Sequence, residues 1–80
     1  MDYEGYISGI DVIATKGKPV RCLAFVNKKP RSPQYIQVET DDHSVQTALE
    51  MASAKGAKVE VSYIEKGTTR VLTRVRLLDR

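Results

Sequence analysis

Hydrophobic and polar residues alternate along most of this 80-residue chain, with the period of two that is typical of β-strands. The alternation predicts five strands, at residues 5–13, 20–27, 34–40, 58–63 and 70–77. In the first strand, Ile7 falls on one face while Ile10 and Val12 fall on the other. Gly9 lies between them, where a β-bulge would return all three side chains to one face. We therefore expect a bent first strand with a bulge at Gly9.

Residues 42–55 interrupt this alternation and predict a helix. Its apolar positions recur three and four residues apart, at Val45, Ala48, Leu49 and Ala52. Asp42 is a suitable N-cap, and Gly56 follows Lys55 as a typical helix terminator. The helix is short and its apolar stripe is narrow, so we expect it to close one end of a structure built from the strands.

The second and third strands predict an antiparallel hairpin. Pairing them around the loop that contains Pro30 and Pro33 places Phe25 opposite Tyr35 and Arg21 opposite Glu39. Small apolar residues would then meet on one face and the opposite charges on the other, which favours this register. Prolines are tolerated in such a loop because no ladder hydrogen bond is required of them.

The last two strands predict a second hairpin. A three-residue connection at 66–68 would place Val59 opposite Val75 and Glu60 opposite Arg74. On the final strand, Arg70, Arg74 and Arg76 would form one outward basic row. Such a row is also expected of a solvated edge that discourages aggregation between sheets.

The element order is therefore β-β-β-α-β-β in one mainly β domain over residues 1–80. A ferredoxin-like fold would need a second helix, and an SH3-like barrel has no place for a helix of this length after the third strand. The order resembles that of the oligonucleotide/oligosaccharide-binding fold, or OB-fold, a five-stranded Greek-key barrel. That resemblance implies that the helix at about 42–55 caps the barrel between strands three and four.

Two segments resemble particular OB-fold groups. Residues 45–64, VQTALEMASAKGAKVEVSYI, resemble the helix-to-strand segment of ring-forming receptor-binding subunits of bacterial toxins. The turn at 17–19, GKP, and the basic strand from Arg70, RVLTRVRL, resemble parts of small single-strand nucleic-acid-binding OB proteins. The first resemblance implies a ring that recognises a glycan or protein, and the second implies binding of single-stranded DNA or RNA.

Composition and charge limit the partners and the cellular locations that the sequence predicts. The net charge is +3, but residues 16–31 hold six basic side chains and no acid, whereas residues 32–54 hold four acids and no Lys or Arg. A lone cysteine, Cys22, excludes an internal disulfide, and the N-terminus lacks the features of a signal peptide. No apolar stretch approaches the roughly 20 residues that span a bilayer. The sequence thus predicts a cytoplasmic protein without a membrane segment or cofactor.

OB-folds bind single strands on the face of strands two and three and on the flanking loops. There, adjacent Phe25 and Tyr35 rings would stack on bases while cations follow the phosphates. The candidate nucleic-acid-binding residues are Lys16, Lys18, Arg21, Phe25, Lys28, Lys29, Arg31, Tyr35, Gln37, Lys66 and Arg70. The alternative is a homo-oligomer that buries Leu23 and Phe25 and recognises a protein or glycan.

Catalytic and metal-binding signatures are absent from the sequence. His43, the only histidine, adjoins Asp41, Asp42 and Ser44, but residues adjacent in sequence do not by themselves converge into a triad or a metal site. Cys22 has the parity of a core position, which indicates an inert side chain and not a nucleophile. We therefore expect no enzyme activity and no metal site.

Overall fold

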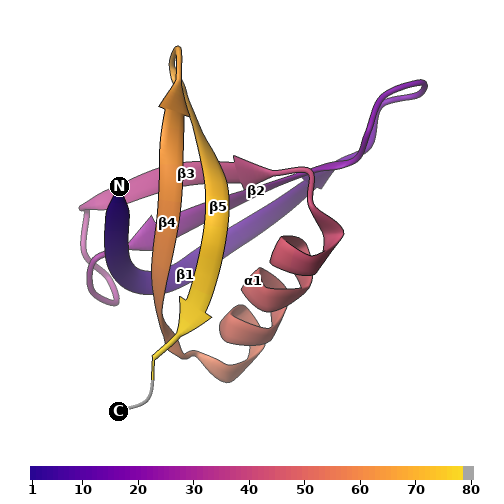
Figure 1. The fold of residues 1–80 in the computed structure, drawn as a ribbon. Helices are drawn as coiled ribbons and strands as arrows, with labels where there is room; N and C mark the ends of the chain where they lie inside the picture. Colours follow the sequence, from indigo (N-terminus) through magenta and orange to yellow (C-terminus); the bar gives the residue numbers. More distant parts are fainter. Residues whose placement is uncertain (79–80) are drawn as a thin grey trace.

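The computed structural model describes residues 1–78 of the chain, and it confirms the predicted element order (Figure 1). The elements are β1 (Asp2–Ile13), β2 (Arg21–Asn27), β3 (Tyr35–Thr40), α1 (His43–Lys55), β4 (Lys58–Lys66) and β5 (Thr69–Leu77). The five strands form a closed barrel in the order β1-β2-β3-β5-β4. Within this described part, no helix is long and apolar enough to cross a membrane.

β1 is long enough to pair with two neighbours, β2 along its second half and β4 along its first. The register with β2 shifts between Ile7 and Gly9, which confirms the predicted bulge. Gly5 lies where β1 passes closest to the end of β2. A Cβ atom at this position would lie 2.1 Å from the backbone oxygen of Asn27, so only glycine fits. The bulge at Gly9 and the close approach at Gly5 together let β1 curve around the barrel.

The weakest join of the barrel lies between β3 and β5. These two strands are parallel, and they are connected by one residue pair, Glu39 with Val71. Every other neighbouring pair of strands is antiparallel and is joined over at least five residue pairs. We call this join the β3–β5 seam.

The barrel interior is filled by small and branched side chains. The buried apolar residues are Cys22, Ala24, Val26, Val38, Leu49, Ala52, Val59, Val61, Tyr63 and Leu72. Leu49 and Ala52 come from α1, which contacts β1, β3 and β5 (Figure 1). The Asp42 carboxylate accepts hydrogen bonds from the amides of Ser44 and Val45, and Gly56 ends the helix with a φ of 62°. Both predicted helix ends are thus confirmed.

The predicted register between β2 and β3 is wrong by two residues. Phe25 pairs with Gln37, and Tyr35 pairs with Asn27. The connecting loop is longer than expected because it has internal structure of its own, in which the Asn27 carboxamide donates to the carbonyl of Ser32 at 2.8 Å and the Lys28 amide donates to the carbonyl of Gln34. A shift of two keeps every side chain on its predicted face.

The predicted register between β4 and β5 is also wrong. The turn has two residues, with Gly67 (φ 61°) at the first central position, where a type II′ turn favours glycine. A bulge beside Ser62 and Tyr63 then changes the phase of β5, so Glu60 pairs with Arg76 and not with Arg74. The hydroxyl of Thr73, the extra residue, donates to the carbonyl of Ser62 at 3.1 Å.

Candidate nucleic-acid interface

An aromatic pair lies on the outer face of β2 and β3. Cys22, Ala24 and Val26 of β2 are fully buried, so the alternate residue Phe25 faces outward. Its ring centroid lies 5.8 Å from that of Tyr35 in an edge-to-face arrangement, with the planes at 70°. Tyr35 is 57% exposed, whereas Phe25 is half-buried. The rings are adjacent as predicted, although as diagonal neighbours and not as a directly opposite pair.

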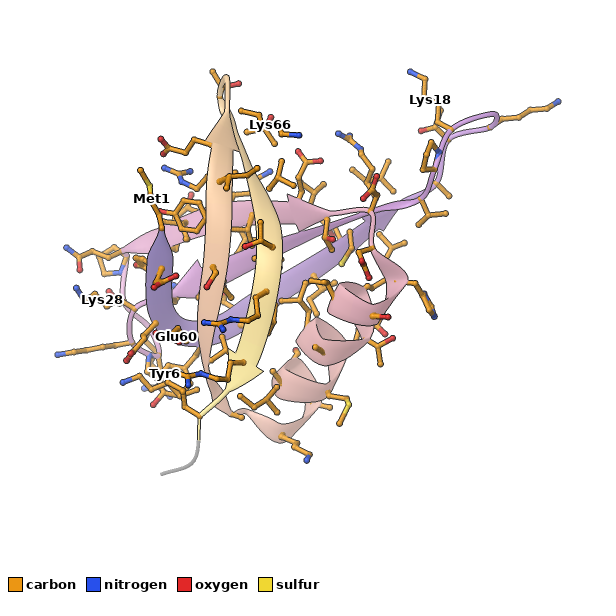
Figure 2. All side chains as sticks on the ribbon, viewed as in Figure 1. Met1, Tyr6, Lys18, Lys28, Glu60 and Lys66 are labelled. Carbon is orange, nitrogen blue, oxygen red and sulfur yellow. The ribbon has the colours of Figure 1, made fainter. Side chains whose placement is uncertain are left out.

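The loop between β2 and β3 presents three cations beside this pair. Lys28, Lys29 and Arg31 are all exposed. The loop is held by a turn in which the Ser32 amide donates to the carbonyl of Lys29, and Figure 2 shows Lys28 directed away from the barrel. Arg31 has a φ of 65°, a left-handed conformation that favours Gly or Asn and that is uncommon for a long side chain. The three cations therefore belong to a loop that is held in shape by its own hydrogen bonds.

Carboxylates lie at the centre of the same outer face. Leu23 pairs with Asp11 on one side and with Glu39 on the other. Glu39 accepts a hydrogen bond from the Arg21 guanidinium at 3.2 Å, so the positive charge of Arg21 is partly neutralised. The carboxylates of Asp11 and Glu39 disfavour a phosphate placed directly over Leu23. They also limit the width of the apolar surface there.

Three adjoining hollows form a second part of the site, which we call the loop groove. The first, of about 370 Å³, is lined by Thr15, Lys18, Pro19, Arg21 and Asp41. The second, of about 240 Å³, is lined by Arg21, Glu39, Thr40, Asp41, Lys66 and Val71. The third, of about 140 Å³, is lined by Gln37, Val38, Glu39, Thr68, Thr69 and Arg70. Because neighbouring hollows share residues, the groove extends from the β1–β2 loop to the β4–β5 turn.

The loop groove brings together four of the predicted cations, Lys18, Arg21, Lys66 and Arg70. Lys18 comes from the β1–β2 loop and Lys66 from the end of β4, and Figure 2 shows both projecting outside the barrel. Lys16 is exposed on the same β1–β2 loop but does not line the groove. Glu39 and Asp41 also line the groove, so its lining has a modest excess of positive charge.

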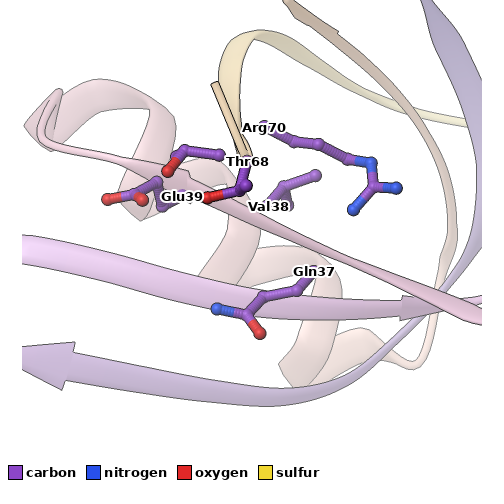
Figure 3. A pocket seen from close by; sticks show the side chains of 6 residues that line it. Gln37, Val38, Glu39, Thr68 and Arg70 are labelled. Carbon is purple, nitrogen blue, oxygen red and sulfur yellow. The ribbon is translucent and has the colours of Figure 1, made fainter. Parts of the chain in front are cut away.

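Arg70 does not belong to the outward basic row that the sequence predicts. The bulge at Thr73 puts Arg70 in phase with buried Leu72, and the Arg70 guanidinium lies 6.0 Å from the centroid of the Tyr63 ring. Its Nε atom is buried and has no hydrogen-bond partner among the described residues. Figure 3 shows Arg70 and Gln37 beside the third hollow.

The other two arginines of β5 are engaged by one carboxylate. Arg76 donates to Glu60 at 2.6 Å, and Arg74 lies 4.0 Å from the same carboxylate oxygen. Arg74 therefore does make the contact with Glu60 that the sequence predicted, but Arg76 makes the shorter one because it is the residue opposite Glu60 in the ladder. Two of the three predicted row members are thus partly neutralised.

Sequence reasoning missed the threonines of the third hollow and the inward phase of Arg70. Thr68 and Thr69 carry no functional signature, and they line the third hollow from the two-residue β4–β5 turn and the start of β5. A signal for the phase change did exist. Val71 and Leu72 are consecutive apolar residues, and such a pair breaks strict alternation and is compatible with a nearby bulge.

His43 and Cys22, the single histidine and the single cysteine of the chain, lie in different environments. No group of three or more His, Cys, Asp or Glu side chains in residues 1–78 is placed to hold a metal ion. His43 is exposed at the first turn of α1. Cys22 is fully buried, and this burial raises the pKa of its thiol above the ordinary value of 9.0, an effect to which the negative charge of Glu50 adds. A thiol in this environment is a poor nucleophile.

The closed barrel of five strands, with one helix between the third and fourth, is compatible with an OB-like fold. The two parts of the site, the ring pair with its basic loop and the loop groove, lie on or beside the outer face of β2 and β3. Comparison of the chain with protein-family models, with curated proteins and with solved structures finds no match. The function of the protein is therefore inferred from the geometry of this face.

Proposed function

We propose that this protein is a non-catalytic module with an OB-type fold that binds single-stranded DNA or RNA with weak sequence preference. The observation that carries the proposal is the exposed ring of Tyr35, packed on Phe25 and bordered by the ordered cationic loop that follows β2. Every base has a π-face, so a ring platform binds bases of any sequence, and nearby cations attract the phosphates.

The aromatic platform is supported from below. A Cβ atom at Gly9 would lie 3.6 Å from Cδ2 of Phe25, so the Phe25 ring covers the glycine of the β1 bulge. Phe25 in turn fixes the Tyr35 ring by an edge-to-face contact. A side chain that is already held in place loses little conformational freedom when a base stacks on it.

The conformation of Arg31 supports a functional role for the β2–β3 loop. A left-handed φ at a non-glycine residue costs on the order of 1 kcal/mol. Glycine or asparagine would relieve that strain, but neither would supply a cation. The arrangement places three positive charges beside the rings, at the opposite end of β2 from the loop groove.

The direct test is fluorescence anisotropy with a labelled single-stranded oligonucleotide of about 12 nucleotides, a length within the range of OB-fold sites. We expect binding that weakens strongly between about 50 mM and about 200 mM salt, because each neutralised phosphate releases counterions. Absence of binding even at the lower salt concentration would refute the proposal.

Two pairs of variants distinguish binding at this site from a general attraction of nucleic acid to a basic protein. Tyr35→Ala should weaken binding by about tenfold, given about 1–3 kcal/mol per stacked base, whereas Met51→Ala, which truncates an exposed side chain on α1, should not. Lys29→Gln should weaken binding and reduce the salt dependence more than Lys55→Gln, which removes the same charge at the end of α1.

The alternative, an oligomeric subunit that recognises a protein or glycan, uses the same outer face. It requires Leu23 and Phe25 to be buried against a neighbouring copy. Light scattering of the purified protein distinguishes the two: a stable oligomer in which Phe25→Asp restores the monomer would favour the alternative and would leave the ring pair unavailable for stacking.

A further inference from the structure

The third hollow lies at the β3–β5 seam, where the two strands separate beyond their single residue pair. Gln37 of β3 and Thr69 of β5 are each two residues before the members of that pair, Glu39 and Val71. The hollow therefore occupies the place where a longer parallel ladder would have brought the strands together. Its walls are side chains of β3, of the β4–β5 turn and of the first residues of β5 (Figure 3).

The volume of this hollow, about 140 Å³, matches a single aromatic ring. An engineered protein cavity of roughly 150 Å³ accommodates one benzene molecule. A six-membered pyrimidine ring is of that size, whereas the two fused rings of a purine are larger. A pyrimidine ring can therefore lie within the hollow, whereas part of a purine would project from its open side.

The groups that line the hollow are those that read the edges of bases. The Arg70 guanidinium can donate to a carbonyl oxygen, and the Gln37 carboxamide can both donate and accept. Buried Nε of Arg70 has no partner among the described residues, so part of the hydrogen-bonding capacity of this guanidinium is unused. The Tyr63 ring beneath it holds the guanidinium in place.

A phosphate fits the hollow less well than a base. Glu39 lines the hollow, and although its carboxylate pairs with Arg21, its negative charge disfavours a phosphate at close range. A neutral base suffers no such repulsion. The hydroxyls of Thr68 and Thr69 provide further donors and acceptors that suit the mixed edge of a base.

We propose that the hollow at the β3–β5 seam binds one pyrimidine base and gives the protein a preference for pyrimidine-containing single strands. This inference rests on the proposed function. Gln37 connects the hollow to the ring pair, because it is the cross-strand partner of Phe25 and lies two residues after Tyr35. One base stacks on Tyr35 while another enters the hollow, where Arg70 donates to its carbonyl oxygen.

The test compares oligo-dT with oligo-dA of equal length at one salt concentration, for the wild-type protein and for Gln37→Ala and Arg70→Lys. The readout is the dissociation constant for oligo-dA divided by the dissociation constant for oligo-dT. Adenine strands stack on themselves and bind more weakly for that reason alone, but this contribution is the same for every variant. We expect wild type to favour oligo-dT, and each variant to lower the ratio by about fivefold, the value of one lost hydrogen bond.

Arg74→Lys is the matched control, because it makes the same substitution on the same strand at a residue outside the hollow. It should leave the ratio unchanged. Equal binding of both oligonucleotides by wild type, or a ratio that survives in both hollow variants, would overturn the pyrimidine pocket while leaving nucleic-acid binding intact. Failure to bind either oligonucleotide would refute the proposed function and the pocket with it.

Discussion

The rings of Phe25 and Tyr35 meet edge to face with centroids 5.8 Å apart, although the strand ladder places each of them opposite a polar residue, Gln37 and Asn27 respectively. Diagonal neighbours on a sheet lie farther apart than direct partners, so the contact depends on the length of the aromatic side chains. It is favoured by the right-handed twist that brings one diagonal closer than the other.

This contact predicts a measurable coupling between the two rings. A double-mutant cycle with Phe25→Ala and Tyr35→Ala, measured by urea unfolding, should give a coupling energy of about 0.5–1.5 kcal/mol. Phe25→Ala should be the more destabilising single change because its ring is half-buried over Gly9. Strictly additive effects would show that the rings do not support one another.

Glu39 is expected to limit nucleic-acid binding, because its carboxylate engages Arg21 on the binding face. Glu39→Gln should therefore strengthen binding several-fold at low salt and increase the dependence on salt concentration, since Arg21 becomes available to a phosphate. Glu4→Gln is the control, because Glu4 pairs with Lys58 away from that face. Equal effects of the two substitutions in anisotropy titrations would indicate that only the net charge of the protein matters.

Two glycines of β1 should differ greatly in their tolerance of alanine. Gly5→Ala places a methyl group 2.1 Å from the Asn27 backbone oxygen, a clash that no side-chain rotation relieves, and should cost at least about 3 kcal/mol. Gly9→Ala meets only the Phe25 ring at 3.6 Å, an ordinary contact, and should change the free energy of unfolding by less than about 1 kcal/mol. Urea titrations of both variants compare the two sites directly.

The buried thiol of Cys22 predicts a loss of stability at alkaline pH. Its pKa is raised in the folded protein by burial, and further by Glu50, so the unfolded chain releases the thiol proton at a lower pH than the folded one does. The stabilising contribution is complete below about pH 9 and is lost as the pH rises through the folded pKa.

Cys22→Ala removes this titration. The difference in unfolding free energy between wild type and the variant should therefore shrink as the pH rises above about 9. Tyrosines and lysines titrate in the same range, but they do so in both proteins and cancel in the difference. A constant difference would contradict the assigned cause.

Periodicity was sufficient to predict the element order, the bulge at Gly9 and both ends of α1. These features depend on local sequence, namely an interrupted alternation, an N-cap at Asp42 and a glycine after Lys55. The two hairpin registers were not predictable in this way. Between β2 and β3 the loop contains its own turn at Ser32, and shifts of two residues leave the same side chains facing the core.

The sequence predicted which residues belong to the candidate site better than it predicted how they are arranged. Ten of its charged, polar and aromatic members reach the outer face or the loops as expected, but Arg70 turns inward because of one extra residue at Thr73. The third hollow was unpredictable for a related reason. It exists because β3 and β5, which are distant in sequence, separate after one pair, and no local pattern encodes that separation.

The single pair between Glu39 and Val71 gives the barrel one preferred place to open. The antiparallel sheets β1-β2-β3 and β4-β5 are each held by extensive ladders, and the β1–β4 ladder joins them on the other side. We therefore expect local opening to begin at the β3–β5 join. Amide protons bordering the join should exchange with solvent by local breathing, faster than those of Ala24 or Val61. Such breathing would change the width of the barrel at the β3–β5 join while the strand ladders of both sheets stay intact.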